Sequence, residues 1–307
     1  MLNKVIHYLT NKKYRFDINA SRFGYKRMSD EEFLKIKYRN AFGCDLNLLS
    51  PSTFNEKLQW LKLNDRNPIY TKLVDKCEVK EYVGNIIGKE HVIPTIGVWD
   101  SFDQIDFSQL PNQFVIKCTH DSGGVIVCKD KKDFNYKNAK HKINKCLKRN
   151  YYFCSREWPY KDVKPRIIVE KYMTDAPESS DFTDYKFFCF NGIVDCVMVC
   201  LERSSGETKF YFFDQDWKLK RLNKRGVSAP EDFTIPKPKC IDQMFEIAKR
   251  LSENIPFVRI DLYQSEETVF FGEMTFYPDS GFDANILPKT DEYWGNLLNI
   301  TNININK

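Results

Sequence analysis

The sequence predicts an α+β fold that begins with a helical region and continues in apolar strands joined by short turns. Residues 1–65 carry helix-start signals and apolar residues at helical spacing. From residue 113 onward, short apolar runs alternate with turn-forming residues, which is typical of strands and hairpins. With 307 residues, 42% hydrophobic and 15% aromatic, the chain can bury a core as one large domain or as two to three subdomains.

The charges are mixed and the cysteines are scattered. Lys and Arg number 47 against 42 Asp and Glu, and this net charge of +5 mildly favours anionic partners such as nucleotides or acidic sugars. We find no nucleic-acid motif and expect no nucleic-acid partner. The ten cysteines form no Cys-x-x-Cys pair and there are four histidines, so we expect no zinc site. Without a secretory signal, we expect reduced thiols in a cytoplasmic protein.

The N-terminal region is predicted to be helical. Residues 1–9 are too short and polar to span a bilayer. Because Lys12, Lys13 and Arg15 follow, they could lie on an anionic surface such as the inner membrane face, but a packed helix is the favoured interpretation. Residues 29–32 start a helix that Gly43 ends, and residues 50–61 lead from a loop into another.

Residues 75–128 predict a helix, an edge strand and a hairpin. The helix starts at residues 75–83, and residues 92–99 indicate an edge strand because they contain proline. Strands over 113–118 and 125–128 flank a polar turn in which Gly123 and Gly124 let backbone N–H groups approach phosphate oxygens. Lys117 would add a positive charge there. The alternative is an ordinary hairpin turn that uses glycine for positive φ.

The remaining chain is predicted to consist mainly of strands. A basic helix covers 133–152, and a strand over 165–173 runs into a polar loop, 174–183. Asn191-Gly192 predicts a hairpin between strands 184–190 and 194–200, because Asn-Gly suits a two-residue turn. A further pair surrounds residues 214–217, and a helix over 240–254 precedes the last hairpin.

The last hairpin, formed by residues 257–263 and 269–275, carries a pair of acidic residues. Alternation places Arg259, Asp261 and Tyr263 on one face, and Glu273, Thr275 and Tyr277 on one face of the partner strand. If the register brings these faces together, Asp261 and Glu273 lie diagonally across the pair, within reach of one Mg²⁺. The alternative is a hairpin with a solvated polar face.

Asp214-Gln215-Asp216 supports a competing function. An Asp-x-Asp string holds a metal and a diphosphate in many glycosyltransferases, which would make this chain a transferase of polysaccharide biosynthesis. We favour a hairpin turn instead, because Asp is common in turns and strand-like runs flank the string.

The order of these pieces resembles the ATP-grasp fold and, more narrowly, the TupA-like ATP-grasp proteins of bacterial surface-polysaccharide and teichuronopeptide synthesis. The resemblance covers about residues 35–298. The motifs that carry it are Asp75-Lys76, Phe114–Lys117 with His120–Gly124, Val169–Tyr172, Asp184–Phe187 with Phe190–Gly192, Arg259–Tyr263 and Gly272–Thr275.

The resemblance implies two α+β subdomains that clamp ATP and assigns a role to each motif. Its divisions are a helical region (1–70), a pre-grasp segment (71–112), a lid subdomain (113–183), a metal-binding subdomain (184–298) and a tail (299–307). The phosphates of ATP would contact Lys76 and Lys117, and the lid turn would consist of His120, Ser122, Gly123 and Gly124. Glu170 would accept a hydrogen bond from the adenine amino group, and Lys171 and Tyr172 would supply hinge contacts.

The resemblance also implies roles at the γ-phosphate. Asp184 or Lys186 would lie near the ribose or the γ-phosphate, and Arg259 would steady the transferred phosphoryl group. Mg²⁺ would be held by Asp261, Glu273 and Thr275.

The implied reaction is carboxylate activation by ATP, followed by amide formation through an acyl-phosphate. The expected partners are a uronic acid or acidic peptide and an amine or amino acid, with an acceptor that could be a lipid-linked glycan. Arg203, Arg221 and Arg225 could receive the acidic substrate or be solvated surface residues, and Arg225 joins Arg259 and Lys186 as a catalytic candidate. Thr275 stands where most ATP-grasp enzymes have Asn, which leaves open whether one or two Mg²⁺ ions bind. A non-catalytic nucleotide-binding protein is a further alternative.

Overall fold

The structure is a computed structural model that describes residues 2–22, 24–173, 183–202, 208–301 and 303. The helices are α1 (Leu2–Thr10), α2 (Lys12–Ser21), α3 (Asp30–Phe42), α4 (Phe54–Asn64), α5 (Ile69–Val74), α6 (Val79–Ile87), α7 (Tyr136–Leu147), α8 (Tyr152–Ser155), α9 (Lys224–Ser228), α10 (Ile241–Ser252) and α11 (Pro288–Leu297). The strands are β1 (Thr95–Trp99), β2 (Phe114–Cys118), β3 (Val125–Cys128), β4 (Ile167–Lys171), β5 (Asp184–Phe190), β6 (Ile193–Leu201), β7 (Lys209–Phe213), β8 (Leu219–Lys220), β9 (Phe257–Ser265) and β10 (Thr268–Thr275).

The predicted helix signals in the N-terminal region are confirmed. The Ser29 side chain accepts a hydrogen bond from the Glu32 backbone N–H at 3.2 Å, which satisfies one of the open donors at the start of α3. Gly43 ends the same helix with φ of +77°, a left-handed conformation that glycine adopts without steric cost. Thr53 and Glu56 form a reciprocal capping box at the start of α4.

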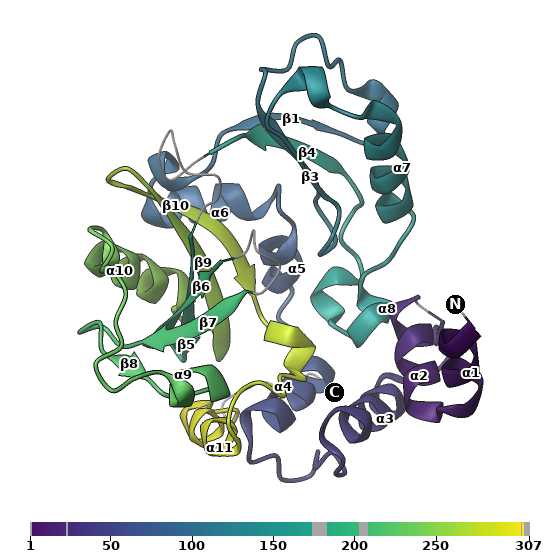
Figure 1. Cartoon of the computed structure of the whole chain (residues 1–307), viewed down its shortest axis with the longest axis vertical. Coiled ribbons are helices and arrows are strands. Elements are labelled where there is room, and N and C mark those ends of the chain that lie inside the picture. The colour runs from purple at the N-terminus through teal and green to yellow at the C-terminus, as the bar shows by residue number, and fades with distance from the viewer. Residues whose placement is uncertain (1, 23, 174–182, 203–207, 302, 304–307) are drawn as a thin grey trace.

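The smaller sheet has the strand order β1-β4-β2-β3, and all of its pairs are antiparallel. The strand with proline just before it, β1, lies at an edge, as predicted. One face of this sheet is covered by α7, whose Ile143 and Cys146 pack with Ile116 and Cys118 of β2 (Figure 1). The predicted helix over 133–152 is too long, since α7 ends at Leu147 and the separate short helix α8 follows.

The larger sheet has the strand order β10-β9-β5-β6-β7-β8. The predicted hairpin turn between β5 and β6 is confirmed, because Asn191 and Gly192 both have positive φ, +50° and +80°. Helix α10 covers one face, where the ring centroids of Phe245 and Phe187 lie 5.1 Å apart (Figure 1). Since Lys186 precedes Phe187 on β5, Lys186 lies on the opposite face.

An aromatic cluster covers that opposite face near the C-terminal end of β5. Trp294 of α11 is 1% exposed, and its ring centroid lies 4.7 Å from that of Phe188 and 5.3 Å from that of Phe54 on α4. The indole N–H donates to Asp195 at 3.0 Å. The cluster therefore joins α4 to the larger sheet. It leaves the part of the face around Lys186 to polar residues.

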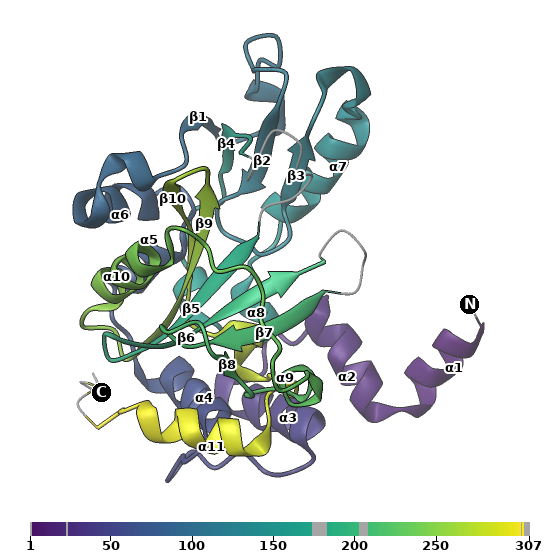
Figure 2. The same cartoon turned by 60° about the vertical axis from the view of Figure 1, so that its left-hand side comes forward.

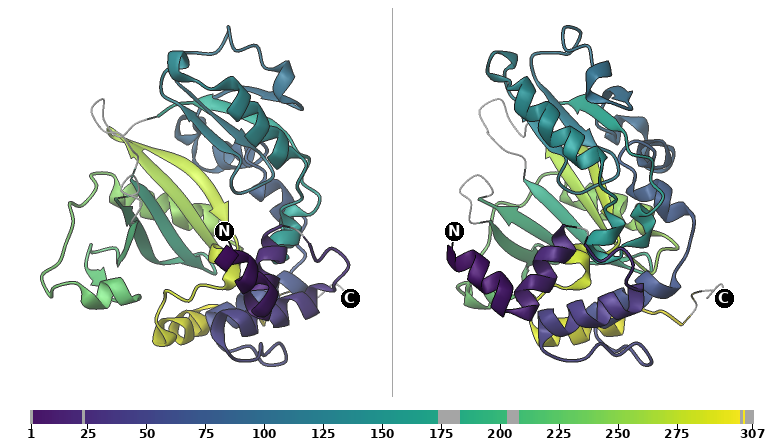
Figure 3. Two further views of the ribbon diagram at one scale, coloured as in Figure 1. Left: turned by 45° about the vertical axis from the view of Figure 1, so that its right-hand side comes forward. Right: turned by 90° about the vertical axis from the view of Figure 1, so that its right-hand side faces the viewer.

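The first helix packs against the second. Among the described elements, α2 is the neighbour with which α1 makes extensive contacts. Figure 3 shows the two helices extending away from the sheets. Among the described residues, every helix is too short or too polar to serve as a bilayer-spanning segment.

Replacing Trp294 with alanine should lower the free energy of unfolding by about 3–5 kcal/mol, because a large buried aromatic side chain is lost and leaves a cavity. Urea denaturation of the wild type and the variant would measure this difference. Leu49→Ala is the control, since Leu49 is fully exposed. Equal unfolding midpoints for the two variants would contradict the structural role given to Trp294.

Candidate active site

The predicted acidic pair lies on β9 and β10 in a register that a β-bulge creates. Phe271 lies opposite Leu262, but the next pairs are Glu273 with Asp261 and Thr275 with Arg259, so Gly272 is an extra residue. Without this bulge, Glu273 would lie opposite Ile260 and would point to the α10 side of the sheet. The two carboxylates therefore lie directly opposite one another, and the expected diagonal placement is wrong.

Gly272 suits the bulge because a side chain there would collide with its neighbours. An added Cβ would lie 2.6 Å from the Tyr263 ring and 3.0 Å from the Asp261 carbonyl oxygen. Glycine thus allows β10 to approach β9 closely at the point where the register changes.

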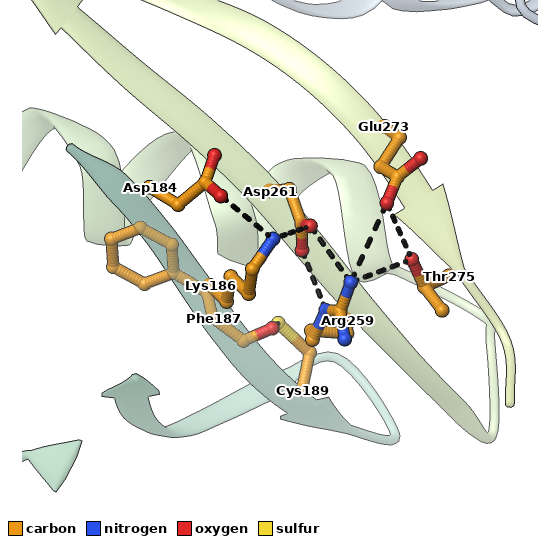
Figure 4. A network of polar contacts seen from close by, with 8 residues as sticks. All are labelled: Asp184, Lys186, Phe187, Cys189, Arg259, Asp261, Glu273 and Thr275. Carbon is orange, nitrogen blue, oxygen red and sulfur yellow. Dashed lines mark hydrogen bonds and ion pairs between the residues drawn. The ribbon is translucent and has the colours of Figure 1, made fainter. Parts of the chain in front are cut away.

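Arg259 connects the three residues predicted to bind metal (Figure 4). Its guanidinium donates to both oxygens of Asp261, from Nε to Oδ1 at 2.7 Å and from Nη2 to Oδ2 at 2.8 Å. The same Nη2 donates to Thr275 Oγ1 at 3.1 Å and, more weakly, to Glu273 Oε1 at 3.5 Å. Oxygens from Asp261, Glu273 and Thr275 therefore converge on a single positively charged nitrogen.

Lys186 contributes a second positive charge from the neighbouring strand. It lies opposite Asp261 in the pairing of β5 with β9, and its ammonium group forms ion pairs with Asp261 and, at 3.5 Å, with Asp184. Burial alone would raise the pKa of Asp261, which is 1% exposed, but Arg259 and Lys186 outweigh burial and lower that pKa. Asp261 is therefore held as a carboxylate.

The residues present fit a Mg²⁺ ion. Carboxylate and hydroxyl oxygens are hard ligands of the kind that Mg²⁺ takes, and in this structure they already surround one cationic nitrogen. The Glu273 side chain is 44% exposed and is free to turn toward a ligand. Asp261, Glu273 and Thr275 would hold the ion, which would neutralise charge on phosphate oxygens.

The predicted phosphate turn lies between β2 and β3, and Lys76 is positioned against it. Lys76 Nζ donates to the Asp121 carbonyl oxygen at 2.7 Å, and its backbone N–H donates to Thr119 at 3.1 Å. Ser122 and Gly123 are exposed at the tip, where Gly123 has φ of +150°. At Gly124 an added Cβ would lie 2.7 Å from Cys118 Sγ, so the turn needs glycine there. The structure thus brings Lys76 and the turn together.

Glu170 on β4 holds two lysines. Its carboxylate is buried and forms ion pairs with Lys117, at 2.6 Å, and with Lys80 of α6. Burial would raise the pKa of Glu170, but Lys117 and Lys80 lower it overall. In this arrangement its two oxygens contact the two lysines. The next residue, Lys171, donates its backbone N–H to Pro94 at 3.0 Å, and Tyr172 is half-buried at the strand end.

Lys80 is a candidate site residue that we did not predict. It lies on α6, four residues after Lys76, which precedes that helix. No local signal identifies it, because the charge of Lys80 is satisfied by Glu170 on β4, far along the chain.

His120, the first residue of the predicted lid turn, is buried against α7. This residue is 2% exposed, and its Nε2 lies 3.2 Å from the carbonyl oxygen of Cys146 in α7. Burial lowers the pKa of its imidazole. His120 therefore fastens the turn to α7, and the exposed residues beside it are the ones available to a ligand.

The arginines expected to receive an acidic substrate are not brought to the acidic pair. Arg225 is exposed on α9, which packs on β7, three strand steps from β9 and so about 14 Å across the sheet. Arg221 donates to carbonyl oxygens of its own loop, including Gly226 at 2.6 Å and Ala229 at 2.7 Å. Arg203 lies outside the described residues, as do residues 174–182 of the predicted polar loop, 174–183.

A buried polar cluster beside Glu273 also escaped prediction. Glu157 accepts a hydrogen bond from the Ser280 hydroxyl at 2.7 Å, and burial raises its pKa, to which Glu273 adds. Burial raises the pKa of the Tyr151 hydroxyl, and the charges of Glu157 and Glu273 raise it further. Lys62 of α4 donates to the Ser280 carbonyl at 2.6 Å, and burial lowers its pKa to about 7. The cluster is centred on Ser280, which lies a few residues after the end of β10.

The Asp-x-Asp string forms a turn, as favoured above. Asp214 accepts a hydrogen bond from the Lys218 backbone N–H at 2.8 Å, and Asp216 is exposed. One of the two carboxylates therefore builds the connection between β7 and β8.

A family model shows what the chain is similar to in sequence. The chain matches the family model described as TupA-like ATPgrasp over residues 56–299, which is most of its length. No curated protein matches the chain.

Three solved structures are similar to the chain at low identity. The D-alanine–D-alanine ligase from Helicobacter pylori is 13% identical with a TM-score of 0.45, and the match covers 81% of this chain and 68% of that one. The D-alanine–D-alanine ligase from Bacillus anthracis complexed with ATP is 16% identical with a TM-score of 0.40, covering 73% and 61%. The ATP-grasp ligase PsnB complexed with minimal precursor, Mg and ADP is 9% identical with a TM-score of 0.38, covering 72% and 57%. The chain thus spans less than two thirds of the second and third proteins.

Asp261→Asn should destabilise the fold by about 3–5 kcal/mol at neutral pH, because Arg259 and Lys186 keep their buried charges and lose their shared partner. The lowered pKa of Asp261 means that its ionic contacts stabilise the fold above the unfolded pKa of an aspartate, about 3.9. This contribution is lost as the pH falls through the lower pKa of the folded state. Urea denaturation at pH 7 and at several acidic pH values would show the gap between wild type and variant closing.

The matched control for this prediction is Asp216→Asn, whose carboxylate is 79% exposed. A loss of stability no greater than the control's, or a gap that persists undiminished into strong acid, would argue that Asp261 does not balance the two cations.

Proposed function

The chain belongs to the TupA-like ATP-grasp family, and on that premise we propose that it joins the carboxylate of an acidic sugar or peptide to an amine. Family membership makes the chain an ATP-dependent carboxylate–amine ligase. The observation that best supports the proposed site is the convergence of oxygens from Asp261, Glu273 and Thr275 on one positively charged nitrogen.

The proposed reaction has two steps. A carboxylate oxygen of the first substrate attacks the γ-phosphorus of ATP, the bond to the β-phosphate oxygen breaks, and an acyl-phosphate and ADP form. The nitrogen of the amine then attacks the acyl carbon, inorganic phosphate leaves, and the amide forms as the nitrogen loses a proton. The metal, when bound, neutralises charge on the phosphate oxygens.

The residues of the chain position the substrates and balance charge. Lys186 and Arg259 offer positive charge where the transferred phosphoryl group develops negative charge, which is the main form of catalysis in phosphoryl transfer. Lys76 and Lys117 are proposed to hold the other phosphates beside the glycine turn. Asp184 is proposed to orient Lys186, since the two form an ion pair at 3.5 Å. Glu170, Lys171 and Tyr172 are proposed to border the base.

The proposed substrates follow from the family's link to surface polysaccharides. A uronic acid or acidic peptide would supply the carboxylate, and an amino acid or other amine would be the acceptor. We propose a role in capsular or other surface-polysaccharide biosynthesis. The test is an ADP-release screen of uronic acids paired with amino acids, followed by mass spectrometry of the product. ADP release without an amide product would overturn the proposal.

Glu273→Gln should abolish ADP release in the productive pair while leaving the fold intact. The amide keeps the size of the side chain but removes the charge that a metal needs, and the contact of Glu273 with Arg259 is long. Glu267→Gln, on the exposed turn of the same hairpin, is the control and should retain the activity of the wild type. Near-normal turnover by Glu273→Gln would remove Glu273 from the metal site.

ATP with Mg²⁺ should raise the melting temperature by several degrees, because a ligand at about one hundred times its Kd stabilises the folded state by about 2.7 kcal/mol. Differential scanning fluorimetry would measure the shift.

Lys117→Ala should reduce this shift in melting temperature by weakening nucleotide binding. A shift with UDP-sugars and Mn²⁺ but none with ATP would favour the transferase alternative instead.

A further inference from the structure

The N-terminal helices carry the positive charge of the whole chain. Residues 1–28 contain seven basic residues and one acidic residue, Asp17, for a net charge of +6. The other residues contain 40 basic and 41 acidic residues and are nearly neutral. The net charge of +5 is therefore not spread over the surface but belongs to α1, α2 and the loop that follows them, which we term the basic hairpin.

Polar and aromatic side chains attach α1 to α2. The Tyr8 hydroxyl donates to Asn19 Oδ1 at 2.8 Å, and Arg15 Nη1 donates to the Leu9 carbonyl oxygen at 2.9 Å. The rings of His7 and Tyr14 lie 4.5 Å apart between centroids. The packed side of α1 is thus formed by residues that would tolerate water.

Three aliphatic residues of α1 whose side chains the structure describes lie on another side of the helix and are exposed. Val5, Ile6 and Leu9 are 51%, 49% and 64% exposed. At about 100° per residue, these positions fall within an arc of about 100° on one side of the helix. An isolated helix of this length is marginal in water. An exposed apolar side on such a helix therefore indicates a surface that binds a partner.

The basic hairpin is fixed to the body at α8. Arg156, which follows α8, donates to the carbonyl oxygens of Tyr25 at 2.5 Å and of Met28 at 3.3 Å. Helix α2 itself packs against α8, which follows Tyr151. Figure 2 shows α1 and α2 projecting from the body, so that a flat surface could reach α1.

We propose that the basic hairpin docks on the surface of an anionic lipid bilayer. Val5, Ile6 and Leu9 enter the boundary between headgroups and acyl chains, and exposed basic residues such as Lys12 and Lys13 contact lipid phosphates. An apolar side combined with a cluster of basic residues is what binds interfacial helices to anionic membranes.

The composition of this surface favours a bilayer over other occupants. A second copy of the chain would bring another +6 against the same surface, and the two would repel one another. A nucleic acid would match the charge but would leave the three aliphatic side chains in water. The inference depends on this surface and not on the proposed reaction, so each can fail without the other.

Sedimentation of the full-length chain with lipid vesicles tests the proposal. The chain should bind vesicles that contain phosphatidylglycerol and should not bind vesicles of phosphatidylcholine alone. Binding should fall steeply in 1 M salt, where the Debye length is about 3 Å instead of about 8 Å at physiological ionic strength.

Two paired variants separate the apolar from the electrostatic contribution. Lys12→Glu with Lys13→Glu should lower vesicle binding at least about twentyfold, because each basic residue near such a surface strengthens binding about fivefold. Val5→Ser with Leu9→Ser should also reduce binding while leaving the salt dependence in place. Lys218→Glu and Leu49→Ser are the controls, since both residues are exposed elsewhere, and both should bind like the wild type. Melting temperatures would show whether each variant folds.

Three results would overturn the proposal. These are the absence of binding to anionic vesicles, equal binding to neutral vesicles, and binding unchanged in both paired variants although both are folded. Concentration-dependent dimers that Val5→Ser with Leu9→Ser abolishes, in a chain that ignores vesicles, would assign the apolar side to a second copy instead.

Discussion

The charge balance around Asp261 is the constraint on which the larger sheet depends. A carboxylate buried to this degree would take up a proton unless positive charges lay beside it. Lys186 from β5 and Arg259 from its own strand supply those charges, and Asp261 in turn keeps both cations in place. Because these residues come from neighbouring strands, the register of β5, β9 and β10 determines whether the balance exists.

The bulge at Gly272 creates the register that brings the charged residues to one face of the sheet. It places Lys186, Asp261 and Glu273 in one row across three strands, with Arg259 and Thr275 in the next pair. Met274 and Phe271 meanwhile remain on the side that α10 covers, so the core loses nothing when Glu273 turns to the polar side. One extra glycine therefore reconciles a hydrophobic face and an acidic pair on the same strand.

The sequence allowed prediction of what depends on neighbours in the chain, and much less of what depends on sheet order. Alternation predicted the shared face of Arg259 and Asp261, and Asn191-Gly192 predicted its hairpin. The pairing of Glu170 with Lys80 was not accessible, because it requires knowing where β4 lies relative to α6. Nothing local indicates that the helix carrying Arg225 packs on β7, three strands from the acidic pair. Nothing in the polar turn indicates that α7 lies against the His120 ring.

Both halves of the candidate site are internally neutralised, which constrains how ligands can bind. On the larger sheet, Arg259 fills the space among the oxygens that suit a metal, and on the smaller sheet Glu170 holds Lys117 and Lys80. An anionic ligand would have to compete with Glu170 for Lys117 or Lys80, and a cation would have to compete with Arg259 for the carboxylates. Either exchange would release a charged group that needs a new partner, because an unpaired buried charge is costly.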